Sequence, residues 1–392
     1  MPAWFILIGI RNKMEIPAEG ESMIPPARRF RELLPSLAVL LVTVVLFCAV
    51  LETALRIVYR RSLDFSMEMW KYAVLLKRPV ANPGLSFAHV PNRSAFLMGV
   101  PVSINSHGLR DREYSLAKPR DVYRIVMLGD STTFGWGVPV EQTVAKILER
   151  QLNATTHDEH RRFEVLNAGV GNYGTVQEFN HYLTYDRAFS PDLVILEYFI
   201  NDPEPVPAER TPGLLGKSYL LAFSAARYDL ILRLLGARPR WEQYYAGLYR
   251  DDAPGLQAAK QALAGLAAAV RSDAAKLLVT ILPELHEINA RYPFTQEQQK
   301  IKDVLDASRV PVIDLIEGLR NHGPEASLWV TPADDHPNGK ANGLIAAQIL
   351  PFILGERSPL PSGSRRLASG AIRAKASPRP RQGRPCPAGD TR

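Results

Sequence analysis

Cysteine is scarce in this chain of 392 residues, which has only Cys48 and Cys386. Cys48 lies in an apolar run and Cys386 lies in the C-terminal tail, so no disulfide within one domain is available. The residues just before Cys48 are large, whereas a lipoprotein cleavage site requires small residues at that point. We therefore expect Cys48 to pack toward lipid.

An excess of charge is also missing from most of the chain. The formal net charge is +7, but nine Lys/Arg and one acid, Asp390, follow Glu356, so this tail alone carries +8. The remainder is close to neutral, which gives no support for nucleic-acid binding. No fixed-period repeat is present, so a solenoid is not indicated. The length allows one large domain or two.

Charge is absent altogether from Leu33 to Leu51, a run rich in Leu, Val and Ala. As a helix these residues would rise roughly 28 Å, enough to cross the hydrocarbon core of a bilayer. A buried core helix rarely runs this long without a polar face, and a signal peptide has a shorter apolar region and a small-x-small cleavage site. We therefore predict a transmembrane signal anchor over 33–55, and we assign no structure to the flank 1–32.

Basic residues flank this run almost equally on both sides, at Arg28, Arg29, Arg31, Arg56, Arg60 and Arg61. The positive-inside rule is therefore close to a tie. Leader segments usually enter the membrane with the short N-terminal side retained inside. On that basis we expect a single-pass protein of the cell inner membrane whose large C-terminal part is periplasmic or otherwise extracytoplasmic.

Strand-like apolar runs alternate with helical patterns over the predicted domain 121–355. The strand-like runs are 125–128, 163–166, 193–199, 277–282 and 310–315, and the helical patterns are about 141–154, 175–188, 254–274, 295–308 and 338–350. This alternation predicts an α/β domain with a parallel sheet covered on both faces. We expect the preceding segment, 63–120, to be an ordered lead-in of loops and short strands.

Two segments depart from this pattern. Residues 203–250 contain Pro-rich and aromatic stretches, and we expect a helical insertion over the carboxyl edge of the sheet, as a lid or substrate wall. An additional packed helix pair is an equally good interpretation. Residues 356–392 are rich in Pro, Arg, Ser and Gly and predict a disordered basic tail.

Four polar blocks stand at the ends of predicted strands or at the start of the last helix. They are Gly129-Asp130-Ser131, the glycine-rich turn from Asn167 to Thr175, Asn201-Asp202, and Asp334-Asp335-His336-Pro337-Asn338. Any one block could be a plain turn or a helix cap. Because the carboxyl ends of parallel strands meet at one edge of a sheet, the four together favour a functional site.

The residue types in these blocks suit acyl transfer. A serine hydroxyl such as Ser131 becomes a good nucleophile when a histidine, here His336, takes its proton. The imidazole needs a carboxylate on its other nitrogen, which Asp334 or Asp335 could supply. Donors for the oxyanion could be the N–H of Ser131, an N–H of the 169–172 turn and the amide of Asn201, each typically worth about 3 kcal/mol of barrier.

These blocks resemble those of the SGNH (GDSL-type) hydrolase superfamily, in particular membrane-anchored members with a Gly-Val-x-x-Tyr-x-Thr turn in the second block. The resemblance covers about 120–355 and implies a flavodoxin-like three-layer α/β/α sandwich. It implies that Ser131 is the nucleophile, His336 the base and Asn201 an oxyanion donor. The Gly-x-Ser-x-Gly elbow of α/β-hydrolases is absent around Ser131, which argues against that other fold.

The chain departs from the common superfamily pattern at two points. Asn172 stands where glycine is usual in the second block; a backbone donor does not require glycine, so Asn172 can serve, with Gly171 as the alternative. The usual last block is Asp-x-x-His, but the position for that acid is Ala333. Asp334 makes Asp-x-His instead, a spacing that resembles other branches, so we predict Asp334 as the acid and keep Asp335 open.

No cofactor motif is evident, and we expect no metal site: Glu284 and His286 follow a predicted strand, but two ligands of this kind are typical of a solvated loop. The sequence predicts a serine esterase that acts on an O-acyl ester at the cell envelope through an acyl-enzyme. The expected partners are an acylated glycan or lipid substrate and the membrane. A polysaccharide O-acetyltransferase with the same triad and a non-catalytic envelope binding protein are the alternatives.

Overall fold

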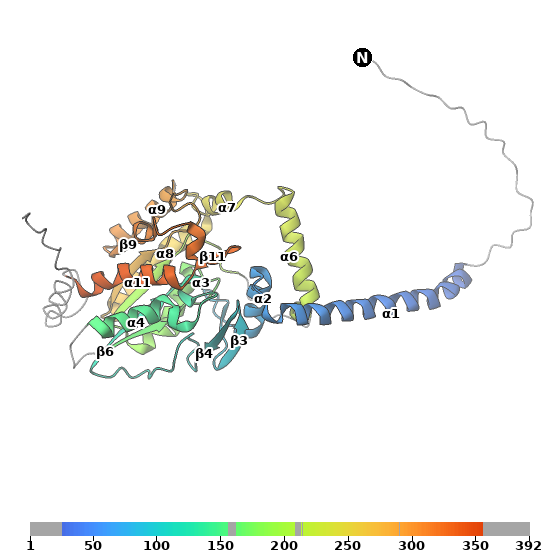
Figure 1. Ribbon diagram of the computed structural model, residues 1–392, viewed down its shortest axis with the longest axis horizontal. Coiled ribbons are helices and arrows are strands. Elements are labelled where there is room, and N and C mark those ends of the chain that lie inside the picture. The colour runs from blue at the N-terminus through green and yellow to red at the C-terminus, as the bar shows by residue number, and fades with distance from the viewer. Residues whose placement is uncertain (1–25, 156–161, 208–212, 214, 290, 356–392) are drawn as a thin grey trace, which may run out of the picture. The chain divides into compact units, whose positions relative to one another are not determined.

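The computed structural model describes residues 26–155, 162–207, 213, 215–289 and 291–355 (Figure 1). The predicted basic tail, 356–392, and most of the N-terminal flank lie outside the described residues. Contacts within the chain divide it into two units, Met1–Ala54 and Leu55–Arg392. We describe each unit by itself.

The described part of the first unit is helical. Helix α1 covers Pro26–Val58, which extends the predicted apolar segment by several residues at each end. Within the described residues, Leu34–Arg61 is the one helical stretch that is long and apolar enough to cross a membrane, and its side chains are exposed rather than packed into a core. A helix with these properties fits either a membrane anchor or a signal sequence.

A five-stranded parallel sheet with the order β6-β5-β7-β8-β9 forms the centre of the second unit. Its strands are β5 (Val122–Leu128), β6 (Arg162–Asn167), β7 (Leu193–Tyr198), β8 (Lys276–Ile281) and β9 (Val312–Asp314). Every residue of β5 and β7 is buried, as both faces of the sheet are covered. The five predicted strands are therefore present, although β9 begins only after Pro311, which has no N–H to give to the ladder.

Helices cover both faces of this sheet. The helices are α4 (Val144–Thr155), α5 (Thr175–Thr184), α8 (Pro254–Ser272), α9 (Thr295–Ala307) and α11 (Gly339–Leu354). Helix α4 packs against α11 (Figure 1), and α5 packs against α8. Helix α4 connects β5 to its neighbour β6 on one side, and α5 connects β6 to β7 on the other side of β5. The two connections run in opposite directions across the sheet, so right-handed crossovers place α4 and α5 on opposite faces.

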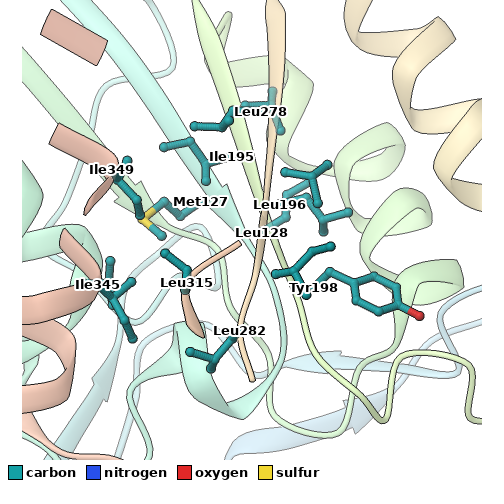
Figure 2. Packing of buried hydrophobic residues seen from close by; sticks show 14 of the residues in the cluster. Met127, Leu128, Ile195, Leu196, Tyr198, Leu278, Leu282, Leu315, Ile345 and Ile349 are labelled. Carbon is teal, nitrogen blue, oxygen red and sulfur yellow. The ribbon is translucent and has the colours of Figure 1, made fainter. Parts of the chain in front are cut away.

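The core lies between the sheet and these helices. Met127 of β5 and Ile195 of β7 pack near Ile345 and Ile349 of α11, whereas Tyr198 points into a different part of the cluster (Figure 2). The chain thus forms the predicted three-layer α/β/α sandwich. The strand order, with β5 flanked by β6 and β7, is the doubly wound arrangement whose switch point lies beside the first strand.

The lead-in segment contains the predicted short strands and one helix that the sequence did not predict. The strands form two antiparallel pairs, β1 (Lys77–Pro79) with β2 (Phe87–His89) and β3 (Arg93–Leu97) with β4 (Val100–Ile104). The helix is α2, Phe65–Leu76, which Asp64 caps by accepting a hydrogen bond from the N–H of Met67. It buries Met67, Tyr72 and Leu76 against the rest of the second unit, to which it belongs.

The described part of the 203–250 segment contains helices, as expected, joined by turns. It contains η4 (Leu215–Lys217), α6 (Tyr219–Leu234) and α7 (Trp241–Leu248). The other short elements are η1 (Tyr59–Arg61), α3 (Ser131–Phe134), η2 (Val140–Gln142), η3 (Asp186–Phe189), α10 (Ile316–Leu319), η5 (Glu325–Leu328), β10 (Trp329–Thr331) and β11 (Asp334–Pro337). Strands β10 and β11 pair antiparallel just before α11.

Candidate active site

Ser131 is the first residue of α3, and only Gly129 and Asp130 separate it from the end of β5. Asp130 caps this short helix, because its Oδ1 accepts a hydrogen bond from the N–H of Thr132 at 2.8 Å. The helix ends after one turn at Gly135, which has the left-handed φ of 84° that glycine adopts without strain. A buried strand followed by one capped turn thus places the serine at the carboxyl edge of the sheet.

A continuous series of hydrogen bonds joins Ser131, His336 and Asp334. Ser131 Oγ lies 2.8 Å from His336 Nε2, and His336 Nδ1 lies 2.6 Å from Asp334 Oδ1. Because an ionised carboxylate can only accept, the proton belongs on Nδ1, which leaves Nε2 to accept the proton of the serine hydroxyl. The fold therefore brings together three predicted site residues, of which the serine and the histidine are 205 positions apart.

Asp334, rather than Asp335, contacts the imidazole. Alternate residues of a strand point the same way, so in β11 Asp334 and His336 share one face. Asp334 is buried, and Trp136 Nε1 donates to its Oδ2 at 3.1 Å. Asp335 points elsewhere and lies 3.5 Å from His286 Nδ1. The Asp-x-His spacing is thus suited to a strand.

The electrostatic setting of His336 favours its charged form. Burial lowers the pKa of His336, but the hydrogen bond and the negative charge of Asp334 outweigh this effect, and the charges of Asp335 and Asp130 add to it. The pKa is therefore raised above its ordinary 6.5. An imidazolium formed during a reaction at Ser131 would be stabilised in the same way.

A cavity of about 300 Å³ opens in front of Ser131. Asn172 and Asn201, two of the predicted oxyanion donors, line it together with Ser131 and His336. The Asn201 amide nitrogen donates to Asp130 Oδ2 at 3.1 Å. Since a carboxamide carries two N–H groups, one of them stays available to the cavity.

In the glycine-rich turn, Asn172 lines the cavity and Gly171 does not. The N–H of Gly171 donates to the Tyr72 hydroxyl at 3.0 Å, on the side away from the cavity. The N–H of Asn172 has no hydrogen-bond acceptor within the described residues. Asn172 has a φ of 65°, a left-handed conformation that asparagine tolerates better than most residues, which accounts for its use where glycine is common.

Side chains of the lead-in segment support this turn through hydrogen bonds, a role that no pattern in the sequence predicted. His89 Nδ1 lies 2.8 Å from the carbonyl of Gly108, so it carries the proton, and His89 Nε2 accepts from the Tyr72 hydroxyl at 2.6 Å. The Tyr72 oxygen is then free to accept the N–H of Gly171. His89 is fully enclosed, and burial lowers its pKa to about 3, which keeps this arrangement neutral.

Lys77 completes the support of the turn. Its Nζ donates to the Gly171 carbonyl at 2.5 Å and to Asn172 Oδ1 at 2.9 Å. The ammonium also lies 4.3 Å from the centre of the Tyr72 ring. No carboxylate pairs with Lys77 in the described residues, and burial lowers the pKa of its amine well below the usual 10.5. The Nζ–H groups are directed at the Gly171 carbonyl and at the Asn172 side chain.

Side chains from two other segments form the walls of the cavity. Phe65 and Met69 of α2 line it, and the Phe65 ring lies 5.6 Å from the imidazole of His336, centre to centre. Glu204 and Tyr245 come from the 203–250 segment, so part of that segment does form a wall of the site. Helix α6 does not reach the cavity and contacts α2 instead.

Glu284 and His286, for which the sequence predicted no metal site, form a cluster with Asp335 beside the cavity. Glu284, His286 and Asp335 place ligand-type atoms within 4.8 Å of one another. Burial, together with a hydrogen bond to Asp335 and the charge of Asp335, raises the pKa of Glu284, whereas the same hydrogen bond lowers the pKa of Asp335. Metal ligands must be deprotonated, and His286 Nδ1 is already 2.5 Å from Glu284 Oε1.

Three solved structures are among those similar to part of this chain. TesA shares 18% identity over 59% of this chain and 97% of its own, with a TM-score of 0.37. LAE5, an alpha/beta hydrolase enzyme from the metagenome of Lake Arreo, Spain, shares 14% over 58% and 93%, with a TM-score of 0.41. Axe2, an acetylxylan esterase from Geobacillus stearothermophilus, shares 15% over 60% and 96%, with a TM-score of 0.41.

A comparison with models of protein families identifies the family of this chain. A search of curated proteins found no match. Residues 127–344, more than half of the chain, match the GDSL-like Lipase/Acylhydrolase family. This stretch begins in β5, just before Ser131, and ends in α11, just after His336. The chain therefore belongs to the GDSL-like lipase/acylhydrolase family and is an ester-hydrolysing enzyme.

Proposed function

We propose that the protein is a membrane-anchored serine esterase that cleaves an O-acyl ester at the cell envelope through an acyl-enzyme on Ser131. The observation that carries this proposal is the series of hydrogen bonds from Ser131 Oγ through His336 to Asp334. It opens into a cavity that also contains oxyanion donors. Serine, base and acid thus stand in the order that nucleophilic acyl transfer requires.

In the proposed reaction, Ser131 Oγ attacks the carbonyl carbon of the ester while His336 Nε2 takes the hydroxyl proton. The oxyanion accepts hydrogen bonds from the N–H groups of Ser131 and Asn172 and from the Asn201 amide. The tetrahedral intermediate collapses, and His336 gives its proton to the leaving alcohol. Water then attacks the acyl-enzyme with His336 as the base, which releases the acid and restores the serine. Asp334 stabilises the imidazolium in both steps.

The volume of the cavity supports a substrate with a small acyl group. Its volume of about 300 Å³ lies at the lower end of the range for small-molecule sites. Phe65 and Leu285 give it apolar walls, whereas Glu204 adds a polar side chain. The alcohol part of the ester is proposed to be a glycan or a lipid that extends out of the cavity.

The position of Phe65 supports a substrate at the membrane. Phe65 lines the cavity only four residues after Arg61, the last residue of the apolar helical segment. Four residues span at most about 14 Å. If α1 anchors the protein in the inner membrane, with the large domain extracytoplasmic, the cavity lies close to the lipid surface.

The proposal is tested on the full chain in detergent with a fluorophosphonate probe and p-nitrophenyl acetate. We expect labelling and turnover to be lost in Ser131→Ala and in His336→Ala. Ser94→Ala, which removes an exposed hydroxyl on β3, is the matched control and should behave as the parent. Absence of labelling in a well-folded protein would contradict the proposal. Labelling with almost no turnover would favour the acetyltransferase alternative, to be tested with a glycan acceptor.

A further inference from the structure

Helix α6 has an unusual surface. None of its described residues is buried, although the helix is rich in leucine and other apolar residues. Six large apolar side chains in and just after this helix are between 44% and 78% exposed: Leu221, Tyr228, Leu230, Ile231, Leu234 and Leu235. A surface helix of a soluble domain normally turns such residues toward the core. An apolar patch of this size on the outside indicates a binding surface.

The exposed apolar side chains follow the helical period. Leu221, Ala225, Tyr228, Ile231 and Leu235 recur at intervals of three or four residues and are all exposed. These five therefore form one continuous face, whereas the exposed Leu230 and Leu234 lie on the opposite side of the helix. The more enclosed positions between them include Phe223 and Arg227, whose contacts lie within the protein. The apolar face of α6 thus points away from the domain.

The more enclosed face of α6 contacts the residues at which the candidate membrane span ends. Arg56 donates to the carbonyl of Lys217 at 3.3 Å and lies 5.0 Å from the centre of the Tyr219 ring. The Tyr59 ring lies 5.9 Å from that of Phe223. Arg56 and Tyr59 belong to the last turns of the segment Leu34–Arg61. Arginine and tyrosine at the end of a span are typical of the membrane–water interface.

Charges around α6 also suit a lipid surface. Lys217, Arg227, Arg233, Arg238 and Arg240 lie in or beside the helix, and all but Lys217 also form ion pairs with acids of the chain. Asp229 is the one acid between Lys217 and Arg240. A helix with an apolar face and basic flanks is the type that lies in the interface of a bilayer with anionic lipids.

We propose that α6 lies on the bilayer with its apolar face in the headgroup region, beside the point where α1 leaves the membrane. This inference rests on the proposed anchoring by α1. It has a consequence for the site, because Trp70 of α2 donates to the Gly216 carbonyl at 3.1 Å and packs on Tyr219 at 4.7 Å. Helix α2, which carries Phe65 and Met69 into the cavity, is thereby held at a fixed height above the lipid. The substrate class that fits is an acyl ester presented at the membrane surface.

The inference is tested on the full chain in vesicles of phosphatidylethanolamine and phosphatidylglycerol. Cys48 and Cys386 are replaced by serine, and single cysteines are introduced by Ile231→Cys and by Gln261→Cys, an exposed control on α8. Each is labelled with an environment-sensitive fluorophore. We expect a blue-shifted emission and strong quenching by spin-labelled lipid at position 231, and neither effect at position 261.

Two outcomes would overturn the inference while leaving the anchor intact. In one, the protein floats with the vesicles but the label at position 231 emits as in water. In the other, that label is shielded but is not quenched by lipid, which would indicate a second protein copy on this face. Failure of the protein to float at all would instead refute the anchoring itself, and this inference with it.

Discussion

At the scale of single residues, the charge next to His336 decides the pH at which the proposed base is neutral. We expect Asp334→Asn to lower kcat by about 10⁴-fold, as removal of the acid does in other triads. The pKa of His336 is raised by Asp334, so activity should be lost as the pH falls through that raised value. Without the carboxylate the pKa falls, and the acidic limb of the profile should move to lower pH. The measurement is kcat/KM for p-nitrophenyl acetate against pH.

Asp335→Asn is the matched comparison for this prediction. Asp335 does not touch the imidazole and contributes only through its charge. We expect it to move the acidic limb slightly in the same direction and to leave most of kcat in place. A larger loss in Asp335→Asn than in Asp334→Asn would reverse the assignment of the acid.

Lys77 provides a second prediction at this scale. The carbonyl of Gly171 and the N–H of Asn172 belong to one peptide, so the hydrogen bond that Lys77 Nζ donates to that oxygen makes the N–H a stronger donor. We expect Lys77→Met to lower kcat by roughly tenfold with little change in KM, because the proposed oxyanion exists only in the transition state. Lys77→Arg should restore part of the loss. A fall in the melting temperature with unchanged kcat would leave Lys77 with a structural role only.

At the scale of elements, the approach of the glycine-rich turn to α3 is unusually close. A Cβ on Gly169 would lie 2.3 Å from the backbone nitrogen of Phe134, so α3 and its Ser131 would have to move. We expect Gly169→Ala to lower both the melting temperature and kcat. The control is Gly343→Ala in α11, where a Cβ meets nothing within 4 Å. There the helix should gain about 0.5–1 kcal/mol, with activity unchanged.

A buried carboxyl group under α3 makes the stability of this region depend on pH. Burial raises the pKa of Glu197 to about 7, because its effect is larger than the opposite effect of the hydrogen bonds that Thr132 and Thr133 donate. In the unfolded chain the same group ionises near its ordinary 4.5. Stability is therefore lost as the pH rises from about 4.5 to 7, by roughly 3 kcal/mol in total.

Glu197→Gln should remove this loss, because the amide keeps an acceptor for both threonines but does not ionise. We expect the variant to gain stability over the parent progressively from pH 5 to pH 8, as measured by urea unfolding. Glu317→Gln changes an exposed glutamate and should show no such trend. An equal effect of Glu197→Gln at both pH values would contradict the raised pKa.

At the scale of the whole molecule, α1 is expected to stay in the protein and hold it in the membrane. The full chain should remain in the pellet after an alkaline carbonate wash, at its uncleaved size. Leu41→Lys combined with Val45→Lys should release it, since each charge at the centre of a span costs about 2.5–3.5 kcal/mol on insertion. A shortened, soluble parent would show that the segment acts as a cleaved signal sequence instead.

The amino-acid sequence alone determined the α/β class, the five strands and the positions of the candidate nucleophile and base. These features are local: strands buried on both faces appear as unbroken apolar runs, and each polar block directly follows its own strand or precedes its own helix. The helix α2 was not predicted, because its apolar and charged residues follow no clear period.

Only the tertiary structure decided which of the neighbouring candidates faces the cavity. Asp334 rather than Asp335 contacts His336 because the segment is a strand, and Asn172 rather than Gly171 is available because Tyr72 takes the other N–H. Lys77 supports the turn across a separation of 95 positions, and no local spacing encodes such a contact. The outward position of the apolar residues of α6 was likewise decided by the tertiary structure, because apolar composition alone is also typical of a core helix.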